Sequence, residues 1–442
     1  MSYFRIQGPA RLSGTFTPAG NKNAALPILA GCLLTDQPVR LTNVPEIRDV
    51  QAQLDILRSL GAEVEKPGPN QVVVRATDVP TGRVDPVLAG QIRASVLLAG
   101  PLLARLGEVH LPPPGGDVIG HRRLDTHFLA LSALGAEVEV GEAYFLRGRR
   151  LEGRRIFLDE PSVTATENAI LAAVTASGTT VLHNAAAEPH VQELCRFLAA
   201  LGADIQGIGT PILTVDGVDA LSGGEYRIGS DHIEVGSIIG LAAATGSALT
   251  IRDVPAEHFD PLRVGFSRLG IVCELEAGTL RVPAEQSLEI QPDFGNQITK
   301  IDDGPWPAFP ADLISIALVV ATQCRGTVLM HEKMFESRMF FVDKVISMGG
   351  SLVLCDPHRA VVVGPSRLRG ARLESPDIRA GMALLIAALA ADGTSEIHNI
   401  RQIERGYERI DARLRELGAE VTKVESESDS GGTVPEGAEE SA

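Results

Sequence analysis

Charged side chains stand at the starts of several segments that the sequence otherwise predicts to be apolar helices. Lys22, Arg93 and Arg379 are basic, whereas Glu234 and Asp312 are acidic. A helix N-terminus presents free N–H groups and a positive partial charge, so cations placed there add to an anion-binding site. For each single residue, helix capping or surface solvation is the alternative. The whole set predicts an anionic ligand where these helix starts meet.

Two loops carry further groups that could act on such a ligand. Residues 112–123 (PPPGGDVIGHRR) are rich in Pro and Gly, include Asp117 and end in two arginines. Their place between an expected strand and an expected helix is typical of a mobile lid, with a plain connector as the alternative. Residues 402–409 (QIERGYER) place Arg405 before the last expected helix, where surface ion pairs are the other interpretation.

The elements that position these groups repeat along the chain. Six helix ends carry a glycine, four of them in motifs similar to LGAEV, at positions 61, 135, 202, 270, 349 and 418. A glycine just past a helix adopts the left-handed conformation at little cost, and a strand follows. Spacings of 67 to 79 residues between these glycines indicate six copies of one unit.

Each copy also carries a more apolar helix upstream of its amphipathic helix. These helices are expected at 23–34, 93–106, 166–176, 234–244, 311–322 and 378–391. Because they are apolar on nearly every face, we expect them inside, with the amphipathic helices outside. Six units of this kind predict an α/β protein with two domains of three units each.

Composition limits the class of protein. The apolar fraction is 44% and the charged fraction 22%, so the chain can bury large cores. A net charge of −16 argues against a nucleic-acid binder. Five cysteines without a CxxC pair favour a reducing, cytoplasmic setting over a disulfide framework or a zinc ribbon. No apolar run has the length of a membrane span, and no close histidine spacing suggests a metal site.

In its motifs the chain resembles the UDP-N-acetylglucosamine enolpyruvyl transferases of the EPSP synthase superfamily. The resemblance extends from residue 4 to about residue 424. Its most specific motifs are GNKNAALP at 20–27, PGG at 114–116, SVTATEN at 162–168, PAFPAD at 307–312, FESR at 335–338, DIRA at 377–380 and RGYER at 405–409. The resemblance implies a two-domain, inside-out α/β barrel (α+β) built from six βαβαββ repeats. It places residues 1–21 and 231–424 in the first domain and residues 22–230 in the second.

The resemblance also implies a reaction. The enolpyruvyl group of phosphoenolpyruvate passes to the 3-hydroxyl of UDP-N-acetylglucosamine with release of phosphate, the first committed step of bacterial peptidoglycan synthesis. No metal or redox cofactor is implied, and the expected partners are these two small molecules in the cytoplasm, with neither nucleic acid nor membrane. Because phosphoenolpyruvate carries about three negative charges, a ring of cations is needed to hold it.

Several basic residues are assigned to phosphoenolpyruvate by this resemblance. Lys22, Arg122 and Arg405 hold the phosphate. Arg338 and Arg379 bind the carboxylate, for which the fork of a guanidinium is better suited than an ammonium. The residues implied at this substrate are Lys22, Asn23, Arg122, Arg338, Arg379 and Arg405, and the implied catalytic residues are Lys22, Asp117, Asp312 and Arg405.

The groups implied at the nucleotide sugar come from both halves of the chain. Asp312 accepts the proton of the attacking hydroxyl, as base or as orienter. Ser162 and Val163 contact the diphosphate or the uridine, and Met334 makes a contact through its backbone. The implied set is Asn23, Arg93, Arg122, Arg123, Leu124, Asp125, Thr126, Ser162, Val163, Asp312 and Met334.

Three positions depart from the common pattern of the family. Glu160 stands where many members have a basic residue near the nucleotide, and Arg123-Leu124 replaces a more usual Pro-Val pair. Asp117 occupies the lid position where the family usually has Cys. The first two leave the details of nucleotide binding open, including the role of Glu160.

By the same resemblance, Asp117 protonates the methylene carbon of phosphoenolpyruvate. A nearby phosphate favours the protonated carboxyl that this needs, whereas Arg122 favours the ionised form. Fosfomycin inactivates family members by alkylating the lid thiolate, a far better nucleophile than a carboxylate. We therefore expect an active enzyme that resists fosfomycin and works best at lower pH than a cysteine enzyme. The alternative is that Asp117 only caps the glycine-rich turn.

Other functions remain open at this point. Enolpyruvyl transfer onto shikimate phosphate is the main alternative, although the motif at 20–27 argues against it. A non-catalytic paralogue that binds a nucleotide sugar would be expected to lose Asp312 or one of the arginines, and all are present. An RNA-end-processing enzyme with related repeats fits the acidic charge poorly. The sequence determines neither the oligomeric state nor the tolerance for other UDP-sugars.

The C-terminal residues 425–442 predict a disordered acidic tail, because they hold six acids and no base among Ser and Gly. A tail without apolar anchors cannot offset the entropy of ordering. Removal of all residues after Val424 is therefore expected to leave the melting temperature and the enzymatic rate unchanged. A thermal unfolding curve and a phosphate-release assay check this, and a substantial loss in either would mean that the tail docks on the folded part.

Overall fold

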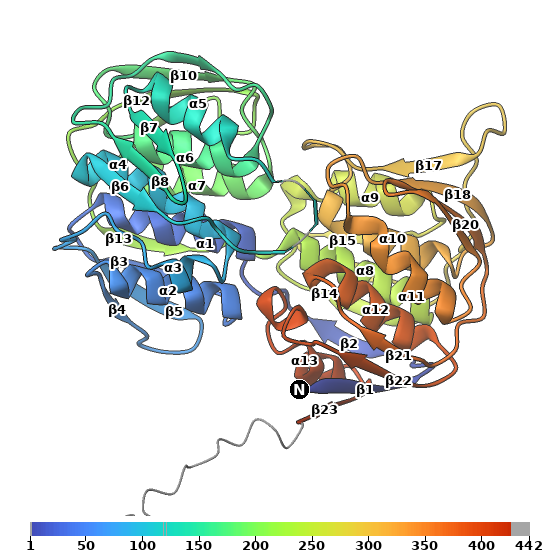
Figure 1. Ribbon diagram of the computed structural model, residues 1–442. Helices are drawn as coiled ribbons and strands as arrows, with labels where there is room; N and C mark the ends of the chain where they lie inside the picture. The colour runs from blue at the N-terminus through green and yellow to red at the C-terminus, as the bar shows by residue number, and fades with distance from the viewer. Residues whose placement is uncertain (1, 118, 121, 426–442) are drawn as a thin grey trace, which may run out of the picture.

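The computed structural model describes residues 2–117, 119–120 and 122–425. Its buried apolar side chains form two separate clusters, one within residues 24–228 and one that joins residues 4–16 to residues 233–421. Figure 1 shows two corresponding lobes. We call them the middle lobe (residues 24–228) and the terminal lobe (residues 4–16 and 233–421). The domain boundaries expected at 21/22 and 230/231 stay a prediction, and the predicted tail beyond Glu425 lies outside the described residues.

Among the described residues, the middle lobe contains eleven strands, seven α-helices and two 3₁₀ turns. Its strands are β3 (Val39–Thr42), β4 (Glu63–Glu65), β5 (Gln71–Arg75), β6 (Glu108–Leu111), β7 (Glu137–Val140), β8 (Tyr144–Arg147), β9 (Arg155–Phe157), β10 (Thr179–His183), β11 (Asp204–Gln206), β12 (Ile212–Asp216) and β13 (Gly224–Arg227). Its helices are α1 (Lys22–Gly31), α2 (Arg48–Ser59), α3 (Pro86–Ala89), α4 (Ala99–Leu106), α5 (Asp125–Ala133), α6 (Val163–Ala173) and α7 (Pro189–Ala200), with 3₁₀ turns η1 (Cys32–Leu34) and η2 (Arg93–Leu98).

The terminal lobe is built in the same way. Its strands are β1 (Tyr3–Gly8), β2 (Ser13–Phe16), β14 (Ala248–Ile251), β15 (Glu274–Glu276), β16 (Thr279–Val282), β17 (Thr299–Asp302), β18 (Gly326–His331), β19 (Leu352–Asp356), β20 (Arg359–Gly364), β21 (Arg372–Glu374), β22 (Gly393–His398) and β23 (Glu420–Val424). Its helices are α8 (His232–Thr245), α9 (Asp260–Ser267), α10 (Ile314–Ala321), α11 (Val342–Ser347), α12 (Ile378–Ala390) and α13 (Ile410–Glu416), with 3₁₀ turns η3 (Ala256–His258), η4 (Ala311–Leu313), η5 (Arg338–Phe341) and η6 (Ile403–Arg405).

Six small sheets form among the described strands, three in each lobe. The sheet β11-β12-β10-β9 shows the repeating plan, because β9 and β10 are parallel while β12 runs antiparallel to both β10 and β11. With α6 between β9 and β10 and α7 between β10 and β11, this is one complete βαβαββ unit. The sheet β6-β8-β7 has three strands, and an isolated parallel bridge between Arg83 and His110 stands where a fourth would lie.

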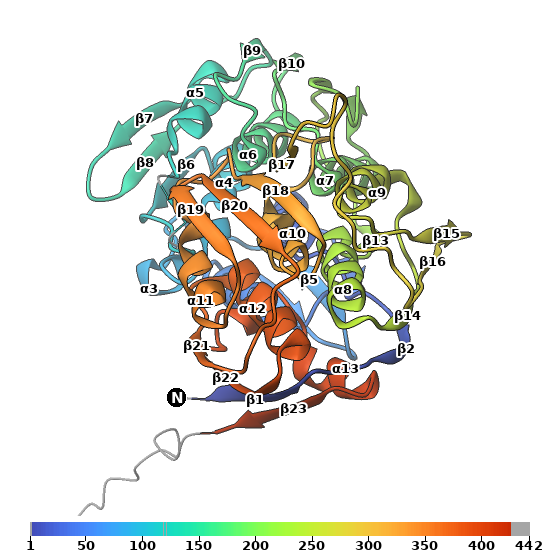
Figure 2. The same ribbon diagram turned by 90° about the vertical axis from the view of Figure 1, so that its right-hand side faces the viewer.

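Strands from distant parts of the chain complete three of the units. β13 pairs with β3, and β2 pairs with β14, in both cases in parallel. β1 lies between β22 and β23, so the two ends of the folded chain share one sheet (Figure 2). The N-terminal strands therefore belong to the same lobe as the C-terminal half of the chain.

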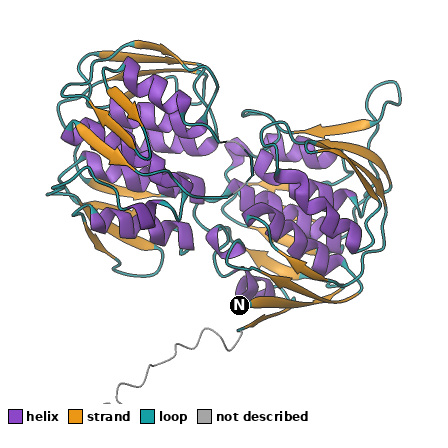
Figure 3. Cartoon of the chain, in the orientation of Figure 1, coloured by secondary structure: helices purple, strands orange, loops and turns teal. Residues whose placement is uncertain are grey.

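The apolar helices lie inside the lobes, as expected from their composition. α1, α6, α8, α10 and α12 are almost entirely buried, as is the first half of α4, and Figure 3 shows helices in the middle of each lobe with strands around them. The first parts of the predicted ranges 93–106 and 311–322 are the 3₁₀ turns η2 and η4, and the last part of 23–34 is η1. With these turns included, the predicted bounds agree with the structure to within two residues except at α6, which spans Val163–Ala173 and not residues 166–176. It begins earlier because the Ser162 side chain accepts a hydrogen bond from the backbone N–H of Ala165 and so caps the helix.

The six repeat glycines all have the left-handed backbone conformation that their position after a helix predicts, with φ between 76° and 106°. The chain passes between the lobes twice, at residues 17–21 and 228–231, where Gly20 and Ser230 form an antiparallel bridge. A Cβ on Gly20 would collide with the carbonyl oxygen of Asn43, so the crossing needs glycine there. Among the described residues, no helix is both long and apolar enough to cross a membrane.

Candidate active site

Three of the charged residues at helix starts interact electrostatically where the lobes face each other. Lys22 is the first residue of α1, Asp312 lies in η4 before α10, and Arg379 lies in the first turn of α12. The Asn21 side chain caps α1 and the Asp377 side chain caps α12.

Two buried arginines hold Asp312 between them. Arg338 Nη2 lies 3.0 Å from Asp312 Oδ1, and Arg379 donates to Asp312 Oδ2 from Nε at 3.0 Å and Nη2 at 2.8 Å. Burial by itself would raise the pKa of Asp312. The charges of Arg379 and Arg338, with that of Lys22, outweigh burial and hold this pKa far below its usual range. Asp312 is consequently an anion fixed in direction by two cations.

The same arginines have donor atoms that Asp312 does not use. Arg338 Nε and Nη1 and Arg379 Nη1 are buried and make no hydrogen bond to any described residue. A buried guanidinium N–H without a partner is costly, which makes a missing acceptor the natural explanation. An anion with two oxygen atoms, such as a carboxylate, would satisfy both arginines at once.

A second chain of charges runs from α1 to the lid. Lys22 Nζ lies 2.7 Å from Asp49 Oδ2, and Arg405 binds both Asp49 oxygens, with Nε 2.8 Å from Oδ1 and Nη2 3.3 Å from Oδ2. Arg405 Nη1 also forms an ion pair with Asp117 Oδ1. Burial raises the pKa of Asp49, but Lys22 and Arg405 outweigh it and lower this pKa below its usual value. Two cations from different lobes thus share one buried carboxylate.

The lid reaches from the middle lobe to the terminal lobe. Gly115 and Gly116 let its stem lie against residues 90–93, because a Cβ on Gly115 would collide with Gly90 O. At its far end, the backbone carbonyl of Ile119 accepts a hydrogen bond of 3.1 Å from the Ser337 N–H. The sequence named Arg122 as the cation near Asp117, and the structure adds Arg405 as its direct partner. Burial lowers the pKa of Arg122, and the charge of Asp117 opposes this shift.

Part of the set implied at the nucleotide sugar lies at the end of the lid and just after it. Arg93 Nη2 donates to the backbone carbonyl of Arg122 at 2.5 Å, and burial followed by the charge of Arg122 lowers the pKa of Arg93 to about 10. Arg123 is exposed and pairs with Asp125 at 2.6 Å, while Leu124 is buried. The Thr126 hydroxyl donates to Asp159. The remaining residues of this set are Asn23 in α1, Ser162 and Val163 at the start of α6, and the exposed Met334.

Two acidic residues at helix starts, Glu234 and Glu167, interact with other groups than Asp312 and its arginines. Glu234 pairs with Arg413 at 2.6 Å and accepts the backbone N–H of Ala19 at 2.6 Å. Glu167 is fully buried, and burial followed by the charge of Glu188 raises its pKa well above the usual value. Of the helix starts predicted to meet, Lys22, Asp312 and Arg379 therefore interact with one another, whereas Glu234 pairs with Arg413. Glu160, the unusual residue near the expected nucleotide, is exposed.

Sequence reasoning missed several residues of this region, foremost Asp49. No local signal marked Asp49, but the repeats do mark the loops of two residues that the sequence had named, Asp117 and Arg338. Four units follow their strand with Asn43, Asn184, Asp253 or Asn399 at positive φ. In the two other units, the corresponding strands β6 and β18 lead into the lid and into residues 332–338. The loops that break the repeat are the ones that carry Asp117 and Arg338.

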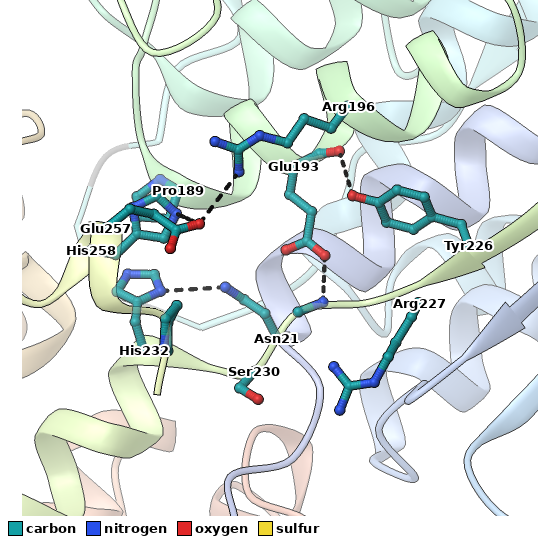
Figure 4. A pocket seen from close by; sticks show the side chains of 12 residues that line it. Asn21, Pro189, Glu193, Arg196, Tyr226, Arg227, Ser230, His232, Glu257 and His258 are labelled. Atoms are coloured by element: carbon teal, nitrogen blue, oxygen red, sulfur yellow. Dashed lines mark hydrogen bonds and ion pairs between the residues drawn. The ribbon is translucent and has the colours of Figure 1, made fainter. Parts of the chain in front are cut away.

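A cavity of about 150 Å³ lies beside the two crossing segments (Figure 4). In it, the Asn21 side chain lies 3.3 Å from His232, and Glu193 accepts the Gly229 N–H at 2.5 Å. None of the implied site residues lines this cavity. In the described part of the chain, no group of three or more His, Cys, Asp or Glu side chains is arranged to hold a metal.

Comparisons with known proteins match this chain to one family. A family model described as EPSP synthase (3-phosphoshikimate 1-carboxyvinyltransferase) matches residues 6–414. The UDP-N-acetylglucosamine 1-carboxyvinyltransferase of Bradyrhizobium diazoefficiens is 59% identical over 95% of this chain and 97% of its own length. The enzyme of the same name from Treponema denticola is 55% identical over 95% of this chain and 99% of its own length.

Solved structures share the fold. The enolpyruvyl transferase NikO of Streptomyces tendae has a TM-score of 0.85 at 23% identity, covering 96% of this chain and 98% of that one. EPSP synthase of Acinetobacter baumannii has a TM-score of 0.73 at 17% identity, covering 96% of this chain and all of that one. At these identities the likeness concerns the fold alone, and it confirms the predicted fold class. The chain belongs to the EPSP synthase family and, within it, to the UDP-N-acetylglucosamine 1-carboxyvinyltransferases.

Proposed function

We propose that this chain transfers the enolpyruvyl group of phosphoenolpyruvate to the 3-hydroxyl of UDP-N-acetylglucosamine and releases phosphate. The observation that carries the proposal is the Arg338–Asp312–Arg379 cluster, in which a fixed carboxylate lies beside three unused guanidinium donors. The reaction is the first committed step of peptidoglycan synthesis, and it therefore serves cell-wall formation, cell shape and division. The proposal places it in the cytoplasm.

Arg338 and Arg379 are proposed to bind the carboxylate of phosphoenolpyruvate through their unused nitrogens. The substrate carboxylate would then share the electrostatic stabilisation that the two arginines otherwise give to Asp312 alone. A carboxylate held by two arginines is a poor base, and its basicity rises when another anion shares those arginines. Asp312 can thus first orient the 3-hydroxyl. It can accept the hydroxyl proton once the substrate carboxylate is bound to both arginines.

The phosphate is proposed to bind Lys22, Arg122 and Arg405. Arg405 then exchanges Asp117 for a phosphate oxygen, which leaves the Asp117 carboxylate beside a dianion and favours its protonation. Protonated Asp117 delivers its proton to the methylene carbon while the hydroxyl oxygen attacks the adjacent carbon. The tetrahedral adduct then loses phosphate and one proton of the new methyl group, which restores the double bond.

The proposed function is tested by the acceptor dependence of phosphate release. Purified protein is mixed with phosphoenolpyruvate and either UDP-N-acetylglucosamine, shikimate 3-phosphate or no acceptor. We expect phosphate only with the nucleotide sugar. Release with shikimate 3-phosphate alone would assign the chain to the other enolpyruvyl transfer, and release without any acceptor would mean simple hydrolysis.

Replacement of Arg379 tests the carboxylate contact. Arg379→Ala should weaken the phosphoenolpyruvate complex by about 1.5–3 kcal/mol, the scale of a charged hydrogen bond, or about 10- to 150-fold in KM. The matched control is Arg367→Ala, because Arg367 is exposed and its pair with Asp392 is at the surface. Steady-state kinetics measure both, and an unchanged KM in Arg379→Ala would remove Arg379 from the site.

A further inference from the structure

Two neighbouring carboxyl groups lie beneath the loop that leads to Arg338. Asp303 follows β17 and Glu332 follows β18, and these two strands pair in parallel, so both residues emerge at the same edge of the sheet. Both side chains are buried, with exposed fractions of 1% and 0%. Buried carboxyl groups need partners, because desolvation penalises their charge heavily. No role at the active site has been given to either residue so far.

The pair holds a turn through three backbone N–H groups. Asp303 accepts the N–H of Lys333 at 2.5 Å and that of Met334 at 3.3 Å. Glu332 Oε1 accepts the N–H of Phe335 at 3.1 Å, so the two carboxyl groups hold the same turn. Residues 332–335 are thereby fixed just ahead of η5, whose first residue is Arg338.

Glu332 also lies close to the guanidinium proposed to bind the substrate. Its Oε2 is 3.8 Å from Arg338 Nε, and among the described residues neither atom makes a hydrogen bond. The ring of Phe335 lies under the same guanidinium, 4.7 Å from Arg338 Cζ. An ionised Glu332 would compete with an incoming carboxylate for Arg338, whereas a neutral Glu332 would not.

We propose that Glu332 is a positioning residue of the phosphoenolpyruvate site. As a neutral acid it fixes the turn at 332–335 through the Phe335 N–H and leaves Arg338 to the substrate carboxylate. This inference rests on the proposed function, since it specifies what keeps one of the carboxylate-binding arginines available. It adds a residue that touches no substrate atom and acts through Arg338.

The charges around Glu332 determine the expected pH dependence. Burial, with a contribution from Asp303, raises the pKa of Glu332 to about 9, and Arg338 opposes this shift. His358, from the turn between β19 and β20, meets the Glu332 backbone: its Nδ1 lies 2.8 Å from the Glu332 carbonyl oxygen, and its own carbonyl accepts the Glu332 N–H at 2.8 Å. Glu332 is therefore neutral at pH 7 and becomes an anion as the pH rises through 9. Substrate binding to Arg338 should weaken above that pH.

The experiment measures kcat and KM for phosphoenolpyruvate from pH 7 to pH 10 at saturating UDP-N-acetylglucosamine. For the unmodified enzyme we expect KM to rise about tenfold between pH 8 and pH 10, as one ionisation near pH 9 requires, with kcat changing much less. Glu332→Gln, which keeps a neutral side chain of the same shape, should remove this rise and keep the low KM. Asp303→Asn should move the rise to lower pH, because the charge that favours protonated Glu332 is lost.

Asp302→Asn is the matched control. Asp302 adjoins Asp303 in sequence, but its carboxylate pairs with the side chains of Lys300, at 2.8 Å, and of Lys333. The same chemical change there should leave the KM profile as it is in the unmodified enzyme.

The outcomes separate this inference from the proposed function. No phosphate release by the unmodified enzyme at neutral pH would overturn the proposed function and the inference with it. An active enzyme whose KM does not rise above pH 9, or a rise that persists in Glu332→Gln, would overturn the inference alone. If Glu332→Gln does not fold, Asp303→Asn decides, since an unmoved rise would assign it to another group.

Discussion

Asp117→Asn is expected to lower kcat by about 10²- to 10⁴-fold, the range that a positioned proton donor contributes. An amide can still accept a hydrogen bond from Arg405, so the lid keeps its contact with η6. It has no acidic proton to give to the methylene carbon. The change therefore removes the proton donor and preserves the contact between the lid and Arg405. The rate of phosphate release at steady state measures the decrease in kcat.

Asp117→Cys provides the complementary control. A thiol can donate the proton, so this variant should stay active, and its thiolate should make it sensitive to fosfomycin. The unmodified protein should resist that epoxide, because its described cysteines are Cys32, Cys195, Cys273, Cys324 and Cys355 and none lies in the lid. Full activity of Asp117→Asn, or rapid covalent inactivation of the unmodified protein, would reduce Asp117 to a cap of the glycine-rich turn.

The second large effect is expected at Asp312. Asp312→Ala should also lower kcat by about 10²- to 10⁴-fold, because the attacking hydroxyl loses the group that orients it and takes its proton. KM for phosphoenolpyruvate should not rise, since Arg338 and Arg379 lose their internal carboxylate and remain free for the substrate. Steady-state kinetics separate the two parameters.

Comparison with Arg379→Ala makes this prediction specific. The arginine variant should change KM most, whereas the aspartate variant should change kcat most. Turnover of Asp312→Ala within a few-fold of the unmodified enzyme would exclude Asp312 as base or orienter. A large rise in its KM would instead mean that Asp312 serves mainly to hold the two arginines in place.

The fold could be predicted from the sequence because its signals are local and repeated. A glycine after each amphipathic helix has the same backbone conformation in all six units, from Gly61 to Gly418. The interior helices were recognisable because they are apolar on every side. The largest error in a helix range, at α6, came from the apolar pattern alone, although Ser162 was in the sequence as a cap.

The partners of the site residues could not be predicted in the same way. Asp49 and Arg405 are 356 positions apart, and nothing local to either indicates that they share a hydrogen bond. Glu234 appeared to be a candidate for the anion site until its pairing with Arg413 was known. Charges at helix starts show which residues could meet, but long-range packing decides which of them do. The assignment of individual substrate contacts stays a prediction.

The most direct test of the proposed reaction is an NMR measurement of the product formed in D₂O. Protonation of the methylene carbon followed by loss of a proton from the new methyl group must place deuterium on carbon. We therefore predict one enol ether at the 3-oxygen of UDP-N-acetylglucosamine for each phosphate released, with deuterium in its vinyl group. Phosphate without an enol ether, or an enol ether whose vinyl carbon carries no deuterium, would contradict the account.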